Sequence, residues 1–288
     1  MTAATFDPLE ADASTVVTRS RKGRWNGPLV AGLVLFGLIV LCALLAPVLT
    51  SYNPITQNLN QAFLPPGSPG HLLGTDSFGR DELSRLLYGA REDLQVGVLA
   101  VVSPFIIGSL IGLVAGWFGG WLDAIIGRIV DIVIAFPFLV LVIALVFAMG
   151  PGTTSIYTAI TLVGWVAYCR IVRGQVLVAK EQEYAMAARA SGLPTWRILL
   201  RHLLPNVILQ AFVYSMSDIV LTLLAIVTLG FLGLGVPPPN PDWGTMIQDG
   251  QQFILSKWWL STIPGVCVVI TGIALALIAD GIVDRTNR

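Results

Sequence analysis

The stretch LQVGVLAVVSPFIIGSLIGLVAGWFGGWL, residues 94–122, decides the fold, because it contains no charged side chain. A helix needs about 17 to 25 mainly apolar residues to cross a bilayer, and this stretch is longer than that. A segment in lipid must also satisfy its own backbone hydrogen bonds, which a helix does internally. The sequence therefore predicts a transmembrane helix here.

Other long apolar stretches on both sides of this one predict five further spans. Residues 132–169 again carry no charge, but they are too long for one span, and the Gly-Pro-Gly at 150–152 divides them into two spans. The chain is therefore predicted to be all-α, with six transmembrane helices. In order, these helices are expected at residues 28–50, within 94–122, twice within 132–169, within 206–236 and within 260–279.

The composition supports a membrane protein. Of the 288 residues 55% are hydrophobic and 12% are charged, whereas a soluble domain carries about 25% charged residues. Too few charges remain to cover a water-facing surface, so membrane lipid is the expected solvent for most of the chain. The formal net charge of zero gives no electrostatic support for a nucleic-acid partner.

The distribution of Lys and Arg predicts the orientation, because positive residues are retained in the cytoplasm. With six spans both termini share one side, and that side collects thirteen Lys and Arg residues against four on the other. The predicted organisation is a cytoplasmic tail (1–27), the first span (28–50), an extracytoplasmic segment (51–93), a core with five spans (94–284) that includes a cytoplasmic loop (180–205), and a cytoplasmic end (285–288). The thirteen are Arg19, Arg21, Lys22, Arg24, Arg128, Arg170, Arg173, Lys180, Arg189, Arg197, Arg201, Arg285 and Arg288, and the four are Arg80, Arg85, Arg91 and Lys257.

Several catalytic motifs are absent from the sequence. A phosphate-binding Walker loop ends in Gly-Lys-Ser/Thr, but no Ser or Thr follows Lys22, Lys180 or Lys257. The only histidines, His71 and His202, are predicted on opposite sides of the membrane, and the three cysteines have no metal-binding spacing. No serine lies in a G-x-S-x-G elbow. We therefore expect no catalytic residue, no metal site and no cofactor in this chain.

The most informative polar segment is EYAMAARASGLPTWRILLRHLLPN, residues 183–206, in the predicted cytoplasmic loop. Its alanines favour a helix, Gly192 permits a tight turn, and Pro194 fits the first turn of a second helix. Such a helical hairpin is suited to dock in a groove on another protein. An apolar stripe at helical spacing is predicted on the second helix, formed by Trp196, Leu199, Leu200 and Leu203.

This segment resembles the EAA loop, E-A-A-x3-G-x9-I-x-L-P, of the permeases of binding-protein-dependent ABC importers. Met186 stands at the position of the motif's Glu and His202 at that of its Ile, while Glu183 supplies a similar charge one turn earlier. In that family the loop couples the permease to its ATPase. By resemblance, the residues expected to contact the ATPase are Glu183, Tyr184, Met186, Ala187, Ala188, Gly192, Leu204 and Pro205.

Three further segments are similar to the dipeptide, oligopeptide and nickel branch of this family, in particular to its C-type permeases. They are HLLGTDSFGRDELSRLLYGAR (71–91), GWFGGWLDAIIGRIVDIVIAFP (116–137) and FLGLGVPPPNPDWGTMIQDG (231–250). The resemblance covers residues 28–284 and implies the type I importer permease fold in the plasma membrane, with a short peptide as the solute. The implied partners are a homologous B-type permease subunit, two ATP-binding subunits that hold ATP and Mg, and an extracytoplasmic substrate-binding protein.

Acidic residues at or within spans are candidates for the translocation pathway, because a charge in a membrane is costly and usually faces protein or water. Asp218, with Ser215 beside it, is expected either to contact a cavity or to make a hydrogen bond between packed helices. Asp131 is expected to pair with Arg128 at the membrane boundary.

The charge-dense segment 75–93 allows three interpretations. Asp76, Arg80, Asp81 and Arg85 are candidate docking residues for the external binding protein. The segment is also compatible with a short amphipathic helix that lies on the membrane. Its mixed charges suit pairing within the chain as well, which favours a structural role.

Three alternative functions differ in class or solute. A nickel or other small-solute permease of the same family would share all these motifs. An ion-coupled secondary transporter would show inverted repeats and broken helices near the midplane, which the sequence does not display clearly. An integral membrane enzyme is disfavoured by the scarcity of histidine and of clustered acids within the spans.

Overall fold

The computed structural model describes residues 27–286, and in this part of the chain every regular element is a helix. The predicted tail with Arg19, Arg21, Lys22 and Arg24, and also Arg288, lies outside the described residues. The helices are α1 (Gly27–Leu44), α2 (Ala46–Leu49), η1 (Leu59–Gln61), α3 (Glu82–Phe118), α4 (Gly120–Ile134), α5 (Phe138–Met149), α6 (Thr153–Ala179), α7 (Glu183–Ala190), α8 (Thr195–Arg197), η2 (Ile198–Leu203), α9 (Leu204–Phe231), α10 (Trp243–Gln251) and α11 (Trp259–Thr286).

Within the described residues, five helices are long and apolar enough to cross a membrane: α1, α3, α6, α11 and the continuous run Thr195–Phe231. Together, α4 and α5 are also long and apolar enough, and they count as a sixth span if this pair, bent by 89°, crosses as one. The all-α, polytopic fold class is thus confirmed, with five unbroken spans and one bent pair.

This bent pair differs from the continuous third span expected within residues 132–169. Pro137 lacks a backbone N–H and restricts the residue before it, so the helix ends before it and α5 starts again at Phe138. With 12 residues α5 is too short to cross a bilayer alone. The bent pair therefore includes Gly120–Ile134, of which residues 123–131 were assigned to no span in the prediction.

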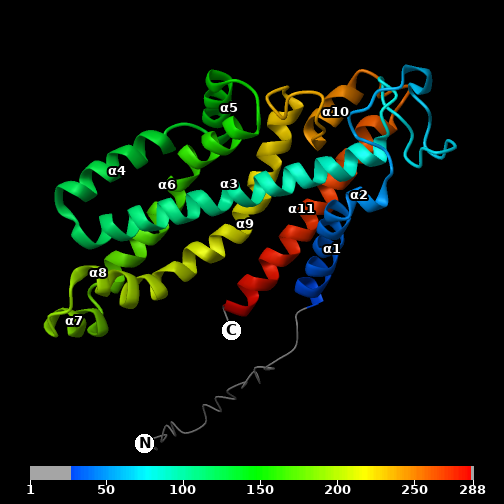
Figure 1. Ribbon diagram of the computed structural model, residues 1–288. Coiled ribbons are helices and arrows are strands. Elements are labelled where there is room, and N and C mark those ends of the chain that lie inside the picture. Colours follow the sequence, from blue (N-terminus) through cyan, green and yellow to red (C-terminus); the bar gives the residue numbers. More distant parts are fainter. Residues whose placement is uncertain (1–26, 287–288) are drawn as a thin grey trace, which may run out of the picture.

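The predicted short amphipathic helix before the second span does not form a separate element. Instead α3 begins at Glu82 and continues for 37 residues through Pro104 to Phe118. Its charged first turns and its apolar remainder belong to one rod, which Figure 1 shows running along most of the molecule.

A stripe of glycines brings α3 against α6. Gly108, Gly112 and Gly116 lie one turn apart, and a Cβ on Gly108 or Gly112 would collide with the backbone carbonyl of Trp165 or Cys169. Small residues at this spacing let two membrane helices approach closely. Van der Waals packing then holds the helices together, because in lipid the hydrophobic effect does not drive them to associate.

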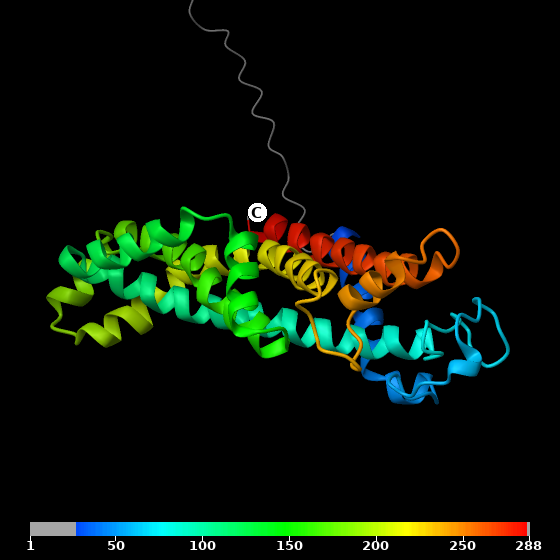
Figure 2. The same cartoon turned by 90° about the horizontal axis from the view of Figure 1, so that it is seen from above.

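The charged segments lie at opposite ends of the molecule. In Figure 1 α7 and α8 occupy one end, while segment 51–81 and α10 occupy the other, and the view from above in Figure 2 agrees. The start of α1 and the end of α11 lie toward the same side of the bundle as α7 in Figure 1. This arrangement fits an even number of crossings, while the cytoplasmic orientation of that side stays a prediction.

Candidate functional site

The segment before α3 is folded by glycines at positive φ. Gly74 has φ +82° and Gly79 has φ +70°, a backbone region that side chains disfavour. A Cβ on Gly79 would also overlap the backbone of Asn58, and one on Gly74 would overlap the carbonyl of Leu64. The Gly-Thr-Asp-Ser-Phe-Gly-Arg-Asp sequence therefore specifies one compact loop conformation.

Aspartates in this loop hold its backbone and start the helix. The carboxylate of Asp76 accepts hydrogen bonds from the backbone N–H groups of Phe78 and Arg80, each at 2.9 Å, and pairs with Nε of Arg80 at 2.6 Å. Asp81 caps α3 by accepting from the backbone N–H of Ser84 at 2.8 Å, and it lies 2.9 Å from Nδ1 of His71. Both aspartates are thus occupied within the chain.

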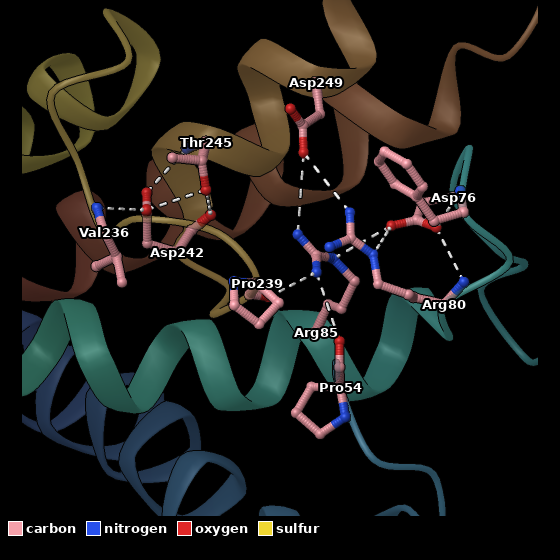
Figure 3. A network of polar contacts seen from close by, with 10 residues as sticks. Pro54, Asp76, Arg80, Arg85, Val236, Pro239, Asp242, Thr245 and Asp249 are labelled. Atoms are coloured by element: carbon pink, nitrogen blue, oxygen red, sulfur yellow. Dashed lines mark hydrogen bonds and ion pairs between the residues drawn. The ribbon is translucent and has the colours of Figure 1, made fainter. Parts of the chain in front are cut away.

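Two buried arginines connect this loop to the far end of the sequence, as Figure 3 shows. The guanidinium groups of Arg80 and Arg85 lie 3.8 Å and 4.0 Å from Oδ2 of Asp249 in α10. Arg85 also reaches Asp76 at 3.5 Å and donates to the carbonyl of Pro239 at 3.5 Å. We call Asp76, Arg80, Arg85 and Asp249 the charge cluster.

The four candidate docking residues are therefore brought together but largely buried. Asp76, Arg80, Asp81 and Arg85 expose 3% to 6% of their surface. Their arrangement favours the interpretation as intramolecular pairing, and a docking role stays a prediction without direct support from the geometry.

A second connection near the charge cluster was not predicted from the sequence. Asp242 caps α10 by accepting from the backbone N–H of Thr245 at 2.8 Å, and burial raises the pKa of its carboxyl although hydrogen bonds oppose the shift. The next residue, Trp243, donates from its backbone to Asp93 and from its indole to the carbonyl of Leu86, each at 3.0 Å. The only signal in the sequence was the Asp-Trp-Gly within the third stretch that carried the resemblance.

A cavity of about 580 Å³ lies where the α4–α5 break faces α6 and α9. Its walls are mainly apolar, and its charged lining residues are Asp218 and Arg170. The lining consists of Val133, Ile134, Phe136, Phe138, Val163, Gly164, Val166, Ala167, Arg170, Ile171, Tyr214, Asp218 and Leu221.

Asp218 takes both of the roles that its sequence position allowed. It lines the cavity, and its Oδ2 accepts a hydrogen bond from the hydroxyl of Tyr168 on α6 at 2.7 Å. The ring of Tyr168 meets that of Tyr214 edge to face at 5.2 Å. Ser215 is buried, donates to the carbonyl of Phe212 at 2.7 Å and does not line the cavity.

The expected pair of Asp131 and Arg128 is not formed within residues 27–286. Both side chains are exposed on α4, and the ion pair of this helix joins Asp123 to Arg173 of α6 instead. Asp131 and Arg128 are three residues apart on the same helix. This closeness in sequence does not make them an ion pair.

The predicted hairpin between the fourth and fifth spans is present. It consists of α7, a turn at Gly192 with φ +71°, and the run of α8 and η2 into α9. Its inner side packs on the ends of α3 and α6. The buried residues on that side are Ala185, Ala188, Ile198, Leu199 and Leu203, which meet Leu113, Val172 and Val176.

The outer side of the hairpin is exposed and partly apolar. Trp196 exposes 60% of its surface, and Tyr184, Met186 and Leu200 are also exposed. The predicted apolar stripe is therefore divided, with Leu199 and Leu203 inside and Trp196 and Leu200 outside. Of the residues expected to contact an ATPase, Glu183, Tyr184, Met186, Ala187, Gly192 and Pro205 are exposed, Leu204 is half-buried and Ala188 is buried.

Two cationic side chains, one in the hairpin and one just before it, hold this region against α3, and neither contact was predicted from the sequence. The guanidinium of Arg189 lies 4.1 Å from the centre of the Trp117 ring, a cation–π contact. The ammonium of Lys180 donates to the carbonyl of Gly116 at 3.0 Å. The hairpin is thus attached firmly to the spans while its outer side stays uncovered.

The sequence matches the family described as "Binding-protein-dependent transport system inner membrane component" over residues 108–288. Residues 25–66 match the "N-terminal TM domain of oligopeptide transport permease C". The chain belongs to the family of inner membrane components of binding-protein-dependent transport systems. It is a multi-pass membrane protein and the permease subunit of an ABC transporter.

Relatives that match nearly the whole chain are peptide permeases by name. The dipeptide transport system permease protein DppC of Escherichia coli K12 is 41% identical over 267 residues, covering 91% of this chain and 89% of the relative. DppC of Alkalihalophilus pseudofirmus is 38% identical, covering 100% and 95%. A putative peptide transport system permease protein of Brucella abortus is 37% identical, covering 97% and 94%.

Proposed function

We propose that this chain is the permease subunit of a binding-protein-dependent ABC importer that translocates short peptides, either dipeptides or oligopeptides. The peptide permeases among its relatives support the solute class. The observation that carries the mechanism is the hairpin, whose inner side is packed on the spans while Tyr184, Met186 and Trp196 remain exposed. An exposed apolar surface on a rigid element is typical of a site that binds another protein.

The hairpin has a direct mechanical connection to the cavity. From Thr195 to Phe231 the chain forms one continuous helical run, which starts in the hairpin and carries Asp218 past the cavity. A partner that moves the hairpin therefore also moves a wall of the cavity. Nucleotide-dependent closure of the partner would favour one conformation of the spans, because it binds that conformation better.

The partners follow from this assignment. We infer a homologous B-type permease subunit beside this chain in lipid, two ATP-binding subunits on the hairpin side and a substrate-binding protein on the opposite, extracytoplasmic side. ATP and Mg are bound and ATP is hydrolysed by the partner subunits, so this chain contributes no catalytic residue. The hairpin side is then the cytoplasmic side, in agreement with the Lys and Arg count.

Uptake by vesicles that hold the full complex tests this proposal. Labelled dipeptides, longer peptides and nickel are offered with the binding protein outside and ATP inside. We expect peptide uptake that requires both ATP and the binding protein. Uptake of nickel without peptide would establish the alternative solute, and uptake on an ion gradient without the ATP-binding subunits would establish a secondary transporter.

A further inference from the structure

The cavity beside Asp218 has the size and the chemistry of a small-ligand site. Its volume of about 580 Å³ lies within the range of about 300 to 1,000 Å³ that such sites occupy. Its walls are apolar, with one acidic side chain, Asp218, well inside the run Thr195–Phe231. The break between Ile134 and Phe138 forms one wall, so the cavity lies at the bend between α4 and α5.

The carboxylate of Asp218 retains capacity for a further partner. Its Oδ2 accepts from the Tyr168 hydroxyl at 2.7 Å, whereas no described residue donates to its Oδ1 and none forms an ion pair with it. An acidic residue at the centre of a membrane helix costs about 2.5 to 3.5 kcal/mol on insertion scales, and such residues mark substrate pathways. A cationic ligand with several N–H donors would supply the missing hydrogen bonds to this carboxylate and neutralise its charge.

The remaining lining residues suit a ligand with variable side chains. Phe136, Phe138 and Tyr214 provide apolar and aromatic walls without further acids, and Arg170 brings the opposite charge to the same cavity. A short peptide carries an ammonium group at one end and a carboxylate at the other, whatever its sequence. Recognition through these ends would allow peptides with different side chains to pass.

We propose that this cavity is a recognition site for a short peptide in transit, in which the Asp218 carboxylate binds the amino-terminal ammonium group. The Tyr168 hydroxyl is a positioning group, because it holds one carboxylate oxygen, while the other oxygen has no donor among the described residues. This inference rests on the proposed function. It specifies which group of the peptide the permease itself recognises.

The first test compares peptide uptake by complexes with single substitutions. Asp218→Asn should lower dipeptide uptake at least tenfold, the loss expected for one charge-assisted hydrogen bond, and Asp218→Glu should restore part of it. The matched control is Asp131→Asn, an exposed carboxyl of α4 that does not line the cavity, and it should transport normally. Uptake by Asp218→Asn equal to that of the wild type overturns the inference alone, whereas a wild type that takes up no peptide removes the proposed function as well.

The second test leaves Asp218 intact, so it also decides the case in which Asp218→Asn fails to assemble. A photo-crosslinking amino acid replaces Leu221, which lines the cavity, or Leu209, an exposed residue of the same helix outside it. During ATP-driven transport a labelled dipeptide should crosslink at position 221 and not at 209, and excess unlabelled dipeptide should compete. Crosslinking at 221 to the sibling permease or to lipid alone would show that something else fills the cavity, and would overturn the inference.

Discussion

The hairpin and the charge cluster stand at opposite ends of the molecule, and both were candidates for partner contact from their sequences. In the charge cluster the arginines and Asp76 are buried and paired within the chain. In the hairpin, Trp196, Met186 and Tyr184 are exposed although the segment is firmly attached. The comparison teaches that charge density marks internal connections here, whereas the exposed apolar side chains of the hairpin form the surface that we propose for a partner.

The largest expected effect breaks the hairpin. Gly192 has φ +71°, while proline fixes φ near −65°, so Gly192→Pro cannot keep this turn. We expect membrane insertion to persist and ATP hydrolysis stimulated by the loaded binding protein to be abolished. The neighbouring Ser191→Ala, which removes only a side-chain bond to the Ala187 carbonyl, should stay near the wild type. Normal stimulation in Gly192→Pro would remove the hairpin from the mechanism.

A second substitution breaks the charge cluster. Arg85→Ala leaves Asp76 buried beside one arginine instead of two, and it removes donors to two backbone carbonyls. Removing one partner of a buried ion pair costs about 3 to 5 kcal/mol. The expected result is a lower unfolding midpoint of the purified complex in detergent. As a control, Arg201→Ala, at an exposed position, should change stability by less than about 0.5 kcal/mol. Equal effects of the two variants would contradict the claim that the charge cluster stabilises the fold.

A third substitution sharpens the contrast within the hairpin itself. Trp196→Ala removes an exposed aromatic side chain, so the stability of the isolated chain should remain unchanged. If this residue anchors the ATP-binding subunit, the dissociation constant should rise by an amount equivalent to about 2 kcal/mol, as for other interface hot spots. Leu199→Ala, from the buried side, should lower stability instead. Unchanged affinity in Trp196→Ala would remove this residue from the interface.

The sequence predicted the features that depend on local composition. Long apolar runs identified the spans, because hydrophobic length is a property of each segment. The hairpin was recognisable from Gly192 and its flanking alanines. The close contact of α3 and α6 at Gly108, Gly112 and Gly116 was not predicted. Long-range partners were not predictable: Tyr168 lies 50 residues from Asp218, and nothing near either residue indicates the other.

The position of the break between α4 and α5 falls between these cases. Pro137 was visible in the sequence, but a proline in a span produces either a kink or a complete break, depending on what packs beside it. The sequence therefore did not predict the 89° angle between α4 and α5. The break forms part of the cavity wall, so the position of the cavity was not predicted either, although Asp218 was a candidate cavity residue.

The smallest expected effect is a pH dependence near the charge cluster. Burial raises the pKa of Asp242 in the folded chain, so the folded state binds more protons than the unfolded state. Its contribution to stability is complete below the ordinary aspartate pKa of about 3.9 and is lost as pH rises through the raised value. The unfolding midpoint of the wild type should therefore decline with rising pH more steeply than that of Asp242→Asn. Identical slopes would contradict the predicted shift.

Thiol labelling of the hairpin in whole complexes tests the central claim most directly. With the three native cysteines replaced, Trp196→Cys is exposed to a membrane-impermeant maleimide in intact cells and in inverted vesicles, and Leu255→Cys, fully exposed at the opposite end, is the control. We predict that Trp196→Cys reacts only in inverted vesicles and is protected when the ATP-binding subunits are bound, while Leu255→Cys reacts only in intact cells. Labelling of Trp196→Cys from outside, or equal labelling with and without the ATP-binding subunits, would contradict the account.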